Sequence, residues 1–317
     1  MSYINTLVDK VYVINLDKDK DRLEQIDAAL RKQNITYERL PATLGSKVTQ
    51  DSRLTYLCNS FCTDGIKGCA LSHHRVWEDA LRNGYSKILV FEDDSIIPDD
   101  FDVKVRDVVS ELPKSYDCIF LGCQFFCRNE SFAEKLGHSL MGTAPESLND
   151  SINRVSGSMG SHAVIYTDTF MKKIIHEPIE THIDVQIQRW IKKFNINAYG
   201  LNPEIVSTTD PTTSSNLADK FPPLLNAILK PIYVTDKISL SWILSENQFK
   251  IAGLNVNLYN ILFFLLAIFL PARITLWFFA WILLEILVSF DIKNGFRLFL
   301  FTAIGLVLRF SIRGRKF

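Results

Sequence analysis

Residues 88–94 read ILVFEDD, an uninterrupted apolar run that ends in three carboxylates. Such a run is typical of a strand that is buried on both faces. In open α/β sheets, ligands bind beyond the carboxyl ends of the strands, where these acids are expected to lie. Adjacent carboxylates raise one another's pKa unless a cation neutralises them, and Mg²⁺ or Mn²⁺ prefers oxygen ligands. The motif therefore predicts a divalent-cation and nucleotide-diphosphate site at Glu92, Asp93 and Asp94; a solvated acidic turn is the alternative.

Strand and helix patterns alternate on both sides of this motif, which predicts an α/β fold. Periodicity and turn residues place the strands at 11–16, 37–40, 86–91, 117–121, 162–166 and 196–201, and the helices at 19–32, 69–82, 102–112, 168–176 and 183–194. Asp168 is expected to cap the helix that it begins. Residues 41–68 are too irregular to assign, and the long polar segment 123–156 is expected to be a functional loop or a mobile lid.

The net charge of zero hides a basic C-terminal end. Residues 291–317 contain six basic residues and one acid, which leaves 29 bases and 34 acids, a net charge of −5, in residues 1–290. The basic residues are Lys293, Arg297, Arg309, Arg313, Arg315 and Lys316. This distribution argues against a nucleic-acid-binding body and favours a tail at an anionic membrane surface.

The chain is expected to have a catalytic domain, a linker and a membrane-associated end. A Ser- and Thr-rich run at 207–216 marks the edge of a catalytic domain of residues 1–220, and residues 221–257 are expected to be a linker or docking segment. Apolar runs then occur at 258–270, 274–290 and 296–310. Because a span needs about 20 apolar residues, we favour an interfacial or re-entrant helical hairpin with a basic tail for residues 258–317. Two true spans and a buried helical subdomain are the alternatives.

The N-terminus predicts a cytoplasmic location. Residues 1–10 contain no apolar run of the length that a secretory signal needs. We therefore expect the catalytic domain at the cytoplasmic face of the membrane. The six cysteines form no CxxC pair, and a reducing compartment favours reduced thiols. A zinc site of Cys58, Cys62 and Cys69 with His73 or His74 is the weaker alternative.

Two further motifs contain groups that can bind a nucleotide. The first strand ends in Asn15 and Asp17, whose side chains can hold a nucleobase or ribose, and Arg22 one helical turn later can meet phosphate. Residues 68–73 read GCALSH, in which Gly68 is expected to begin a helix with Ser72 and His73 in its first turn. Free amides at such a helix start attract phosphate. A surface arginine and an ordinary helix start are the alternatives.

A third region supplies a possible metal ligand and a possible base. Residues 160–162 enter a predicted strand, and residues 181–184 begin a predicted helix. His162 can complete a metal site with Asp94, and Asp184 can act as the general base toward an acceptor hydroxyl. Ordinary helix capping or first-turn charge is the alternative for Asp184.

Three of these blocks, residues 11–17 with Arg22, 68–73 and 89–94, resemble signature blocks of glycosyltransferase family 25, the family of lipooligosaccharide and collagen galactosyltransferases. The resemblance covers about residues 10–210. It implies a GT-A, Rossmann-type fold, a UDP-sugar donor, Mn²⁺ or Mg²⁺, and transfer with inversion. Family members often have an acidic residue just before the Gly-Cys-Ala block, whereas this chain has Ile66 and Lys67.

The resemblance implies a role for each candidate residue. Asp94 would be the first metal ligand, assisted by Glu92 and His162, and Glu92 would also act in catalysis with the base Asp184. The donor would be bound by Asn15, Asp17, Arg22, Gly68, Ser72, His73 and Asp93. We expect galactose to be the transferred sugar and a lipooligosaccharide, lipopolysaccharide or related glycolipid to be the acceptor. A nucleotidyltransferase and a non-catalytic membrane-associated scaffold are the rival hypotheses.

Overall fold

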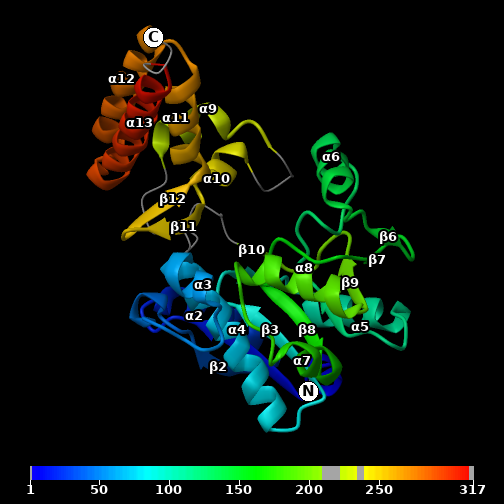
Figure 1. The fold of residues 1–317 in the computed structure, drawn as a ribbon. Coiled ribbons are helices and arrows are strands. Elements are labelled where there is room, and N and C mark those ends of the chain that lie inside the picture. The colour runs from blue at the N-terminus through cyan, green and yellow to red at the C-terminus, as the bar shows by residue number, and fades with distance from the viewer. Residues whose placement is uncertain (1, 209–221, 234–238, 314–317) are drawn as a thin grey trace. The chain divides into compact units, whose positions relative to one another are not determined.

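The computed structural model describes residues 2–208, 222–233 and 239–313 (Figure 1). The chain divides into two compact units, one of residues 1–59 and 66–209 and the other of residues 60–65 and 210–317. The division into domains expected from the sequence stays a prediction. Most of the polar run 207–216, the first residue of the expected linker and the basic residues Arg315 and Lys316 lie outside the described residues.

An eight-stranded sheet forms the centre of the first unit, in the order β2-β1-β3-β8-β5-β9-β7-β6. Its strands are β1 (Lys10–Asn15), β2 (Glu38–Pro41), β3 (Lys87–Glu92), β5 (Cys118–Phe120), β6 (Glu146–Ser147), β7 (Ile152–Arg154), β8 (Ala163–Thr167) and β9 (Ala198–Leu201). Only β8 and β7 run against the other six strands. The predicted α/β class is confirmed, and the GT-A assignment stays a prediction.

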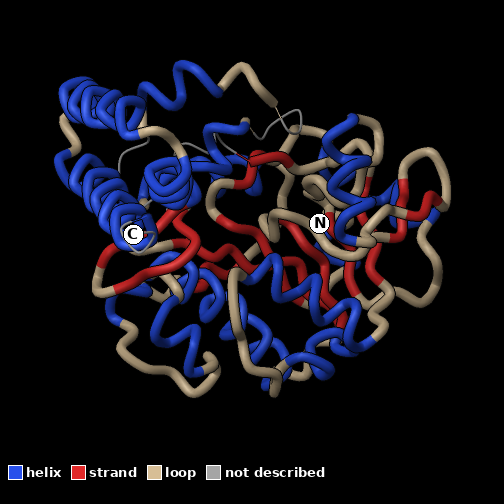
Figure 2. The backbone as a smooth tube through the Cα atoms, turned by 45° about the horizontal axis from the view of Figure 1, so that its top comes forward, coloured by secondary structure: helices blue, strands red, loops and turns tan. Residues whose placement is uncertain are grey.

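Helices cover both faces of this sheet, and Figure 2 shows its red strands running between blue helices. The helices between residues 4 and 194 are α1 (Ile4–Leu7), α2 (Lys20–Lys32), α3 (Tyr56–Phe61), α4 (Asp64–Arg82), α5 (Phe101–Glu111), α6 (Phe132–Met141), α7 (Asp168–Ile174) and α8 (Ile183–Phe194). On one face, Leu89 and Phe91 of β3 pack with residues of α2 and α5. Because strand side chains alternate, the next residues of β3 point to the other face. There Trp77 of α4 packs edge-on against Tyr166 of β8 and Trp190 of α8.

Three local predictions were wrong. Helix α4 begins at Asp64, five residues before the predicted start. Segment 123–156 is not structureless, because it contains α6, β6 and β7, and Ser131 and Glu134 form a capping box at the start of α6. Thr167, not Asp168, caps α7, since its side chain accepts a hydrogen bond from the amide of Phe170.

Two pairs of cysteines are oxidised, against the expectation of reduced thiols. Cys123 and Cys127 form a disulfide, and Cys58 and Cys62 are also disulfide-bonded. The chain folds back between Cys123 and Cys127, so that their Cα atoms lie 5.8 Å apart, within the range that a disulfide spans. A Cβ atom on Gly200 of β9 would lie 2.0 Å from the Cys127 sulfur, so this glycine makes room for the bridge.

The second unit is mainly helical. It contains α9 (Pro223–Leu229), α10 (Leu240–Ser245), the hairpin of β11 (Asn247–Ile251) and β12 (Leu254–Asn257), and the apolar helices α11 (Leu258–Phe269), α12 (Ala272–Ser289) and α13 (Ile292–Arg313). Its small core consists of Leu225, Tyr259, Phe263, Ile282 and Leu298. Gly305 lets α13 approach α11 closely, because a Cβ atom there would lie 2.6 Å from the carbonyl oxygen of Phe264.

The apolar helices expose much of their surface. Trp277 on α12 is 74% exposed and Val307 on α13 is 64% exposed, which a core helix of a soluble protein would avoid. Within the described residues, one helical stretch, Ile292–Ile312, has the length and apolar composition to cross a membrane. Membrane association stays a proposal.

Two residues of the predicted basic tail are buried in the second unit. Arg297 donates a hydrogen bond of 3.0 Å from Nη1 to the carbonyl oxygen of Asn255, and Arg309 donates to the carbonyl oxygen of Leu270. Their partners are a backbone oxygen of β12 and one between α11 and α12, so the prediction that these arginines belong to a surface tail was wrong. Lys293 is exposed, as that prediction requires.

Candidate active site

The acidic motif lies where the sequence predicts, at the end of β3 beside the end of β1. Glu92 is the last residue of β3 and pairs with Ile14 of β1 in parallel register. Asn15, the next residue of β1, donates a 2.7 Å hydrogen bond from Nδ2 to Oδ2 of Asp93. Arg22 of α2 lies 3.3 Å from the other oxygen of Asp93. The structure therefore brings together the first-strand motif and the acidic motif, as predicted.

An arginine that the sequence analysis did not single out joins this group. Arg39 of β2 donates from Nε to Oδ1 of Asn15 at 2.9 Å and from Nη2 to a carboxylate oxygen of Asp17. The parallel register of β1 and β2, which pairs Val13 with Arg39, creates these contacts. Two guanidinium groups, Arg22 and Arg39, thus lie beside the end of β1, where planar donors suit the oxygens of a diphosphate.

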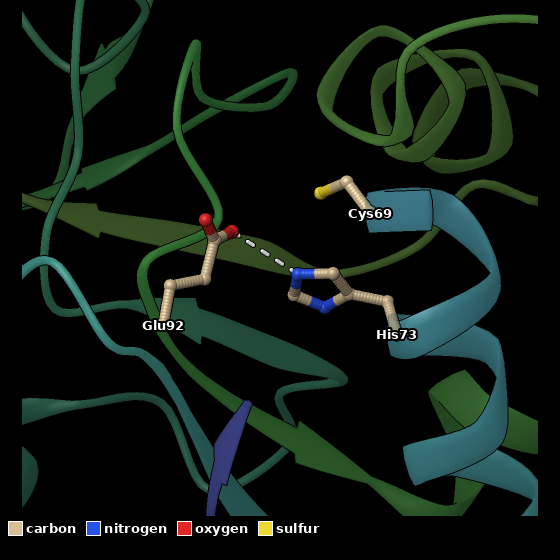
Figure 3. Close-up of side chains that lie close together, drawn as sticks. All are labelled: Cys69, His73 and Glu92. Atoms are coloured by element: carbon tan, nitrogen blue, oxygen red, sulfur yellow. Dashed lines mark hydrogen bonds and ion pairs between the residues drawn. The ribbon is translucent and has the colours of Figure 1, made fainter. Parts of the chain in front are cut away.

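The side chain of Glu92, at the end of β3, points toward His73 of α4 (Figure 3). Its Oε1 lies 3.1 Å from Nε2 of the fully buried His73 and 3.4 Å from the hydroxyl oxygen of Ser161, just before β8. Burial acts to raise the pKa of Glu92, but the hydrogen bond and charge of His73, together with the charge of His162 and the contact with Ser161, hold this pKa below its usual value. Glu92 is therefore ionised at neutral pH.

The environments of Asp94 and Asp184 oppose ionisation of their carboxyl groups, and burial also raises the pKa of Asp93. Burial, followed by the charges of Glu92 and Asp93, raises the pKa of Asp94 to about 7. Its Oδ1 is buried and has no hydrogen-bond partner among the described residues. Burial and the charge of Glu92 raise the pKa of Asp184 to about 6, although the hydroxyl of Ser161 donates to its Oδ1.

Helix α4 supplies Ser72, His73 and Cys69, but not the helix start that was predicted. Because α4 begins at Asp64, the amide of Gly68 lies inside the helix and its free amides belong to the preceding residues. Ser72 donates from its hydroxyl to the carbonyl of Gly68 at 2.6 Å and accepts from the amide of Thr43 at 2.8 Å. Ser72 therefore fixes α4 to residues 43–45, and the predicted phosphate-binding start at Gly68 was wrong.

Close packing against the backbone explains why residue 68 is a glycine. A Cβ atom there would lie 2.6 Å from the carbonyl oxygen of Thr43 and 3.0 Å from the amide nitrogen of Gly45, both of them backbone atoms. We expect Gly68→Ala to lower the free energy of unfolding by about 1 to 3 kcal/mol, because the backbone must shift. Urea unfolding of the full chain measures this change. Arg82→Ala, at an exposed position of the same helix, should change it by less than about 0.5 kcal/mol, and equal effects would contradict the packing argument.

His162 is placed by packing between glycines. A Cβ atom on Gly122 would lie 1.9 Å from its Nε2, and one on Gly160 would lie 2.8 Å from its Nδ1. Nε2 is 3.1 Å from the carbonyl oxygen of Val206, a contact in which the ring nitrogen donates. In this arrangement that nitrogen is not available to a cation, and we leave His162 out of the proposed cation site.

Cys69 also lies in this site, although the sequence analysis considered it only as a possible zinc ligand. Burial, followed by the negative charges of Glu92, Asp184 and Asp94, raises the pKa of its thiol well above the usual value. The thiol is therefore protonated at neutral pH without a bound cation, which argues against a role as a nucleophile.

Comparison with known proteins identifies the family. The sequence matches the family described as Glycosyltransferase family 25 (LPS biosynthesis protein) over residues 8–177, more than half of the chain. The chain belongs to glycosyltransferase family 25. The matched residues contain the motifs at Asn15, Glu92 and Ser161, whereas Asp184 lies beyond them. Membership of family 25 supports a transferase activity.

Two human relatives each match about a third of the chain. "Inactive glycosyltransferase 25 family member 3" of Homo sapiens is 29% identical over 128 residues, 36% of this chain and 22% of the relative. "Procollagen galactosyltransferase 2" of Homo sapiens is 28% identical over 129 residues, 36% of this chain and 20% of the relative. The family 25 chain thus spans about a fifth of the length of these relatives. The solved structure titled "Crystal Structure of A197 from STIV" has a TM-score of 0.34 and 18% identity, covering 62% of this chain and 82% of that chain.

Proposed function

We propose that this chain transfers galactose, with inversion, from UDP-galactose to a saccharide of a lipooligosaccharide, a lipopolysaccharide or a related glycolipid, assisted by Mn²⁺ or Mg²⁺. The family supports the transferase class, and the name of the human galactosyltransferase relative favours galactose. The observation that carries the proposal is the convergence of Glu92, Asp94 and Asp184 at the end of β3, where Oδ1 of Asp94 is buried without a described partner.

The donor atoms fit a hard divalent cation. Asp94, with Glu92 beside it, offers carboxylate oxygens, which are the ligands that Mg²⁺ and Mn²⁺ prefer. A cation at Asp94 would remove the cost of ionising this crowded carboxyl group. When bound, it supplies charge neutralisation for the diphosphate leaving group.

The residues at the end of β1 are suited to the nucleotide. Arg22 and Arg39 are held by Asp93, Asn15 and Asp17, and we propose that they turn toward the diphosphate when the donor binds. The amide of Asn15 can bond a nucleobase or ribose oxygen. This proposal keeps the donor-binding roles of Asn15, Asp17, Arg22 and Asp93.

Asp184 is suited to take a proton from the acceptor. The acceptor hydroxyl oxygen forms its bond to the anomeric carbon as the bond between that carbon and UDP breaks, and the hydroxyl proton passes to Asp184. A pKa of about 6 is close to neutral pH, where a general base is most effective. The hydrogen bond from Ser161 holds the Asp184 carboxylate in one orientation.

A panel of UDP-sugars tests this function. The full chain, with Mn²⁺ and a glycolipid acceptor, should release UDP from UDP-galactose faster than from the other donors, and the new glycosidic bond should have the inverted anomeric configuration. Release of pyrophosphate in a parallel assay with UTP and a sugar 1-phosphate, without release of UDP from any UDP-sugar, would identify a nucleotidyltransferase. Retention of configuration would exclude Asp184 as a base that acts opposite the leaving group.

A second candidate is a binding protein without catalysis, because one relative carries the name of an inactive family member. Such a chain would bind UDP and Mn²⁺ without turnover. The intact carboxylates at Glu92, Asp93 and Asp94 favour the enzyme. Calorimetry that shows UDP binding, combined with no release of UDP from any donor, would favour the binding protein.

We further propose that the second unit attaches the chain to the membrane that contains the acceptor, at its cytoplasmic face. The exposed apolar side chains on α12 and α13 support this proposal. Exposed apolar surface of this kind is stable when lipid covers it.

Flotation with liposomes measures this attachment. The full chain should float with vesicles that contain anionic lipid and remain bound at about 1 M salt, because apolar contacts are not screened. Serine at both Leu276 and Trp277, which are 69% and 74% exposed on α12, should weaken binding at least about tenfold. Serine at Tyr56 and Leu57, which are 77% and 65% exposed on α3, is the matched control. An equal loss in both double variants would contradict attachment through the second unit.

A further inference from the structure

Cys69, His73 and Glu92 bring a sulfur, a nitrogen and an oxygen atom close together (Figure 3). Cys69 and His73 are four residues apart on α4, so one helical turn places both side chains on the same face. Glu92 meets them from the end of β3. One ligand atom from each residue lies within 4.8 Å of the other two, and Nε2 of His73 is 3.1 Å from Oε1 of Glu92.

These atoms fit the geometry of a tetrahedral zinc site. Thiolate, imidazole and carboxylate are the ligand types of Zn²⁺, and bonds of about 2.0 to 2.3 Å place the ligand atoms about 3.3 to 3.6 Å apart. The nitrogen and oxygen already have nearly this spacing. The sulfur needs to move by little more than about 1 Å, which a change in one side-chain torsion provides. Three protein ligands leave the fourth position open.

The donor set and the local charge distinguish this group from the Asp94 site. A thiolate favours Zn²⁺ and other soft cations over Mg²⁺, whereas the oxygens of Asp94 favour the hard cations. The carboxyl groups of Glu92, Asp94 and Asp184 all act electrostatically on Cys69. A cluster of negative charge attracts a divalent cation to this position.

We propose that Cys69, His73 and Glu92 form a binding site for a thiophilic divalent cation such as Zn²⁺. The site shares Glu92 with the proposed transferase machinery, but cation binding at Cys69 does not require that the chain be active. The test of this cation site therefore measures binding directly. If no cation binds there, the transferase proposal is unaffected.

Titration with Cd²⁺ tests the site, because a cadmium–thiolate bond has a charge-transfer absorption in the ultraviolet. The full chain is kept without reductant and without Mg²⁺, so that Cys69 and Cys118 are its free cysteines and Glu92 stays available. We expect the absorption to saturate at one Cd²⁺ per chain and to be displaced by Zn²⁺. Cys69→Ser should abolish it, and His73→Ala should weaken Cd²⁺ binding at least about tenfold.

Cys118→Ser is the matched control, since Cys118 is the other free cysteine and is buried in β5. This variant should bind Cd²⁺ as the unaltered chain does. A variant is compared only when its circular dichroism and thermal unfolding match those of the unaltered chain, and Cys69→Ala and His73→Asn provide second substitutions. No absorption in the unaltered chain, or an absorption that survives at Cys69→Ser, would overturn the proposal.

Discussion

Asp94→Asn should lower metal-dependent sugar transfer by about 10² to 10³-fold and at the same time stabilise the metal-free chain. The loss follows because the amide cannot neutralise a bound cation, and one electrostatic contact to a developing charge contributes about this factor. UDP release with saturating Mn²⁺ measures the activity. A chain in which Asp94→Asn remains fully active would contradict the assignment of Asp94 as the principal cation ligand.

The stability effect has a defined pH dependence. The pKa of Asp94 is raised to about 7, compared with about 3.9 in an unfolded chain. Between these values the folded chain binds more protons, so its stability falls as pH rises through this window. Asp94→Asn removes this fall and, in chelator at pH 8, should raise Tm by about 2 to 4 °C, which corresponds to about 1 kcal/mol.

Asp99→Asn is the matched control for Asp94→Asn. Asp99 is 77% exposed, lies five residues further along the chain and pairs with Lys32 at the surface. It should change neither UDP release nor the dependence of Tm on pH. A gain in stability at Asp99→Asn equal to that at Asp94→Asn would show that general surface charge, and not the crowded site, causes the effect.

Asp184→Asn should lower kcat by about 10² to 10⁴-fold, the contribution expected of a general base. The unaltered enzyme should lose activity as pH falls below about 6, because burial and the charge of Glu92 raise the pKa of Asp184 to that value and the protonated form cannot accept a proton. Rates measured from pH 5 to about 8 would show this limb, and the limb should disappear in Asp184→Asn.

Asp168→Asn tests the specificity of that result. Asp168 occupies the first turn of α7, as Asp184 occupies the first turn of α8, and its partner is Lys172. It should leave kcat and the pH profile unchanged. If Asp184→Asn keeps the same acidic limb as the unaltered enzyme, another group is the base.

Much of the fold could be predicted because its strands and helices carry strong local patterns. The run at residues 88–91 is apolar at successive positions because β3 is buried on both faces, and the acids follow where burial ends. The sequence likewise assigned Asn15 and Asp93 to one donor site, and the two side chains are hydrogen-bonded in the structure. In each case the deciding information is local in the sequence and the parallel pairing of neighbouring strands brings the ends together.

The missed features depend on contacts between distant residues. The pairing of Val13 with Arg39 sets the bonds of Arg39, and only the register of β1 and β2 determines it. The approach of Ser161 to Asp184 likewise comes from the packing of α8 near the start of β8. Gly68 was predicted to begin a helix, but its role is the close approach of α4 to Thr43, which no local pattern reveals.

Segment 123–156 contains a local helix-start signal from which α6 could have been predicted. Ser131 and Glu134 have the spacing of a capping box, and the structure forms both of its hydrogen bonds at the start of α6. The disulfide of Cys123 with Cys127 was not predicted, because the expected reducing compartment argued against disulfides.

Release of UDP from UDP-galactose by the full chain, with a glycolipid acceptor, tests the transferase site most directly. The rate should depend on Mn²⁺ or Mg²⁺, fall to background in chelator, and fall about 10² to 10³-fold in Asp94→Asn. Release at the same low rate by the unaltered chain and Asp94→Asn, with and without the cation, would contradict a metal-dependent transferase at the end of β3.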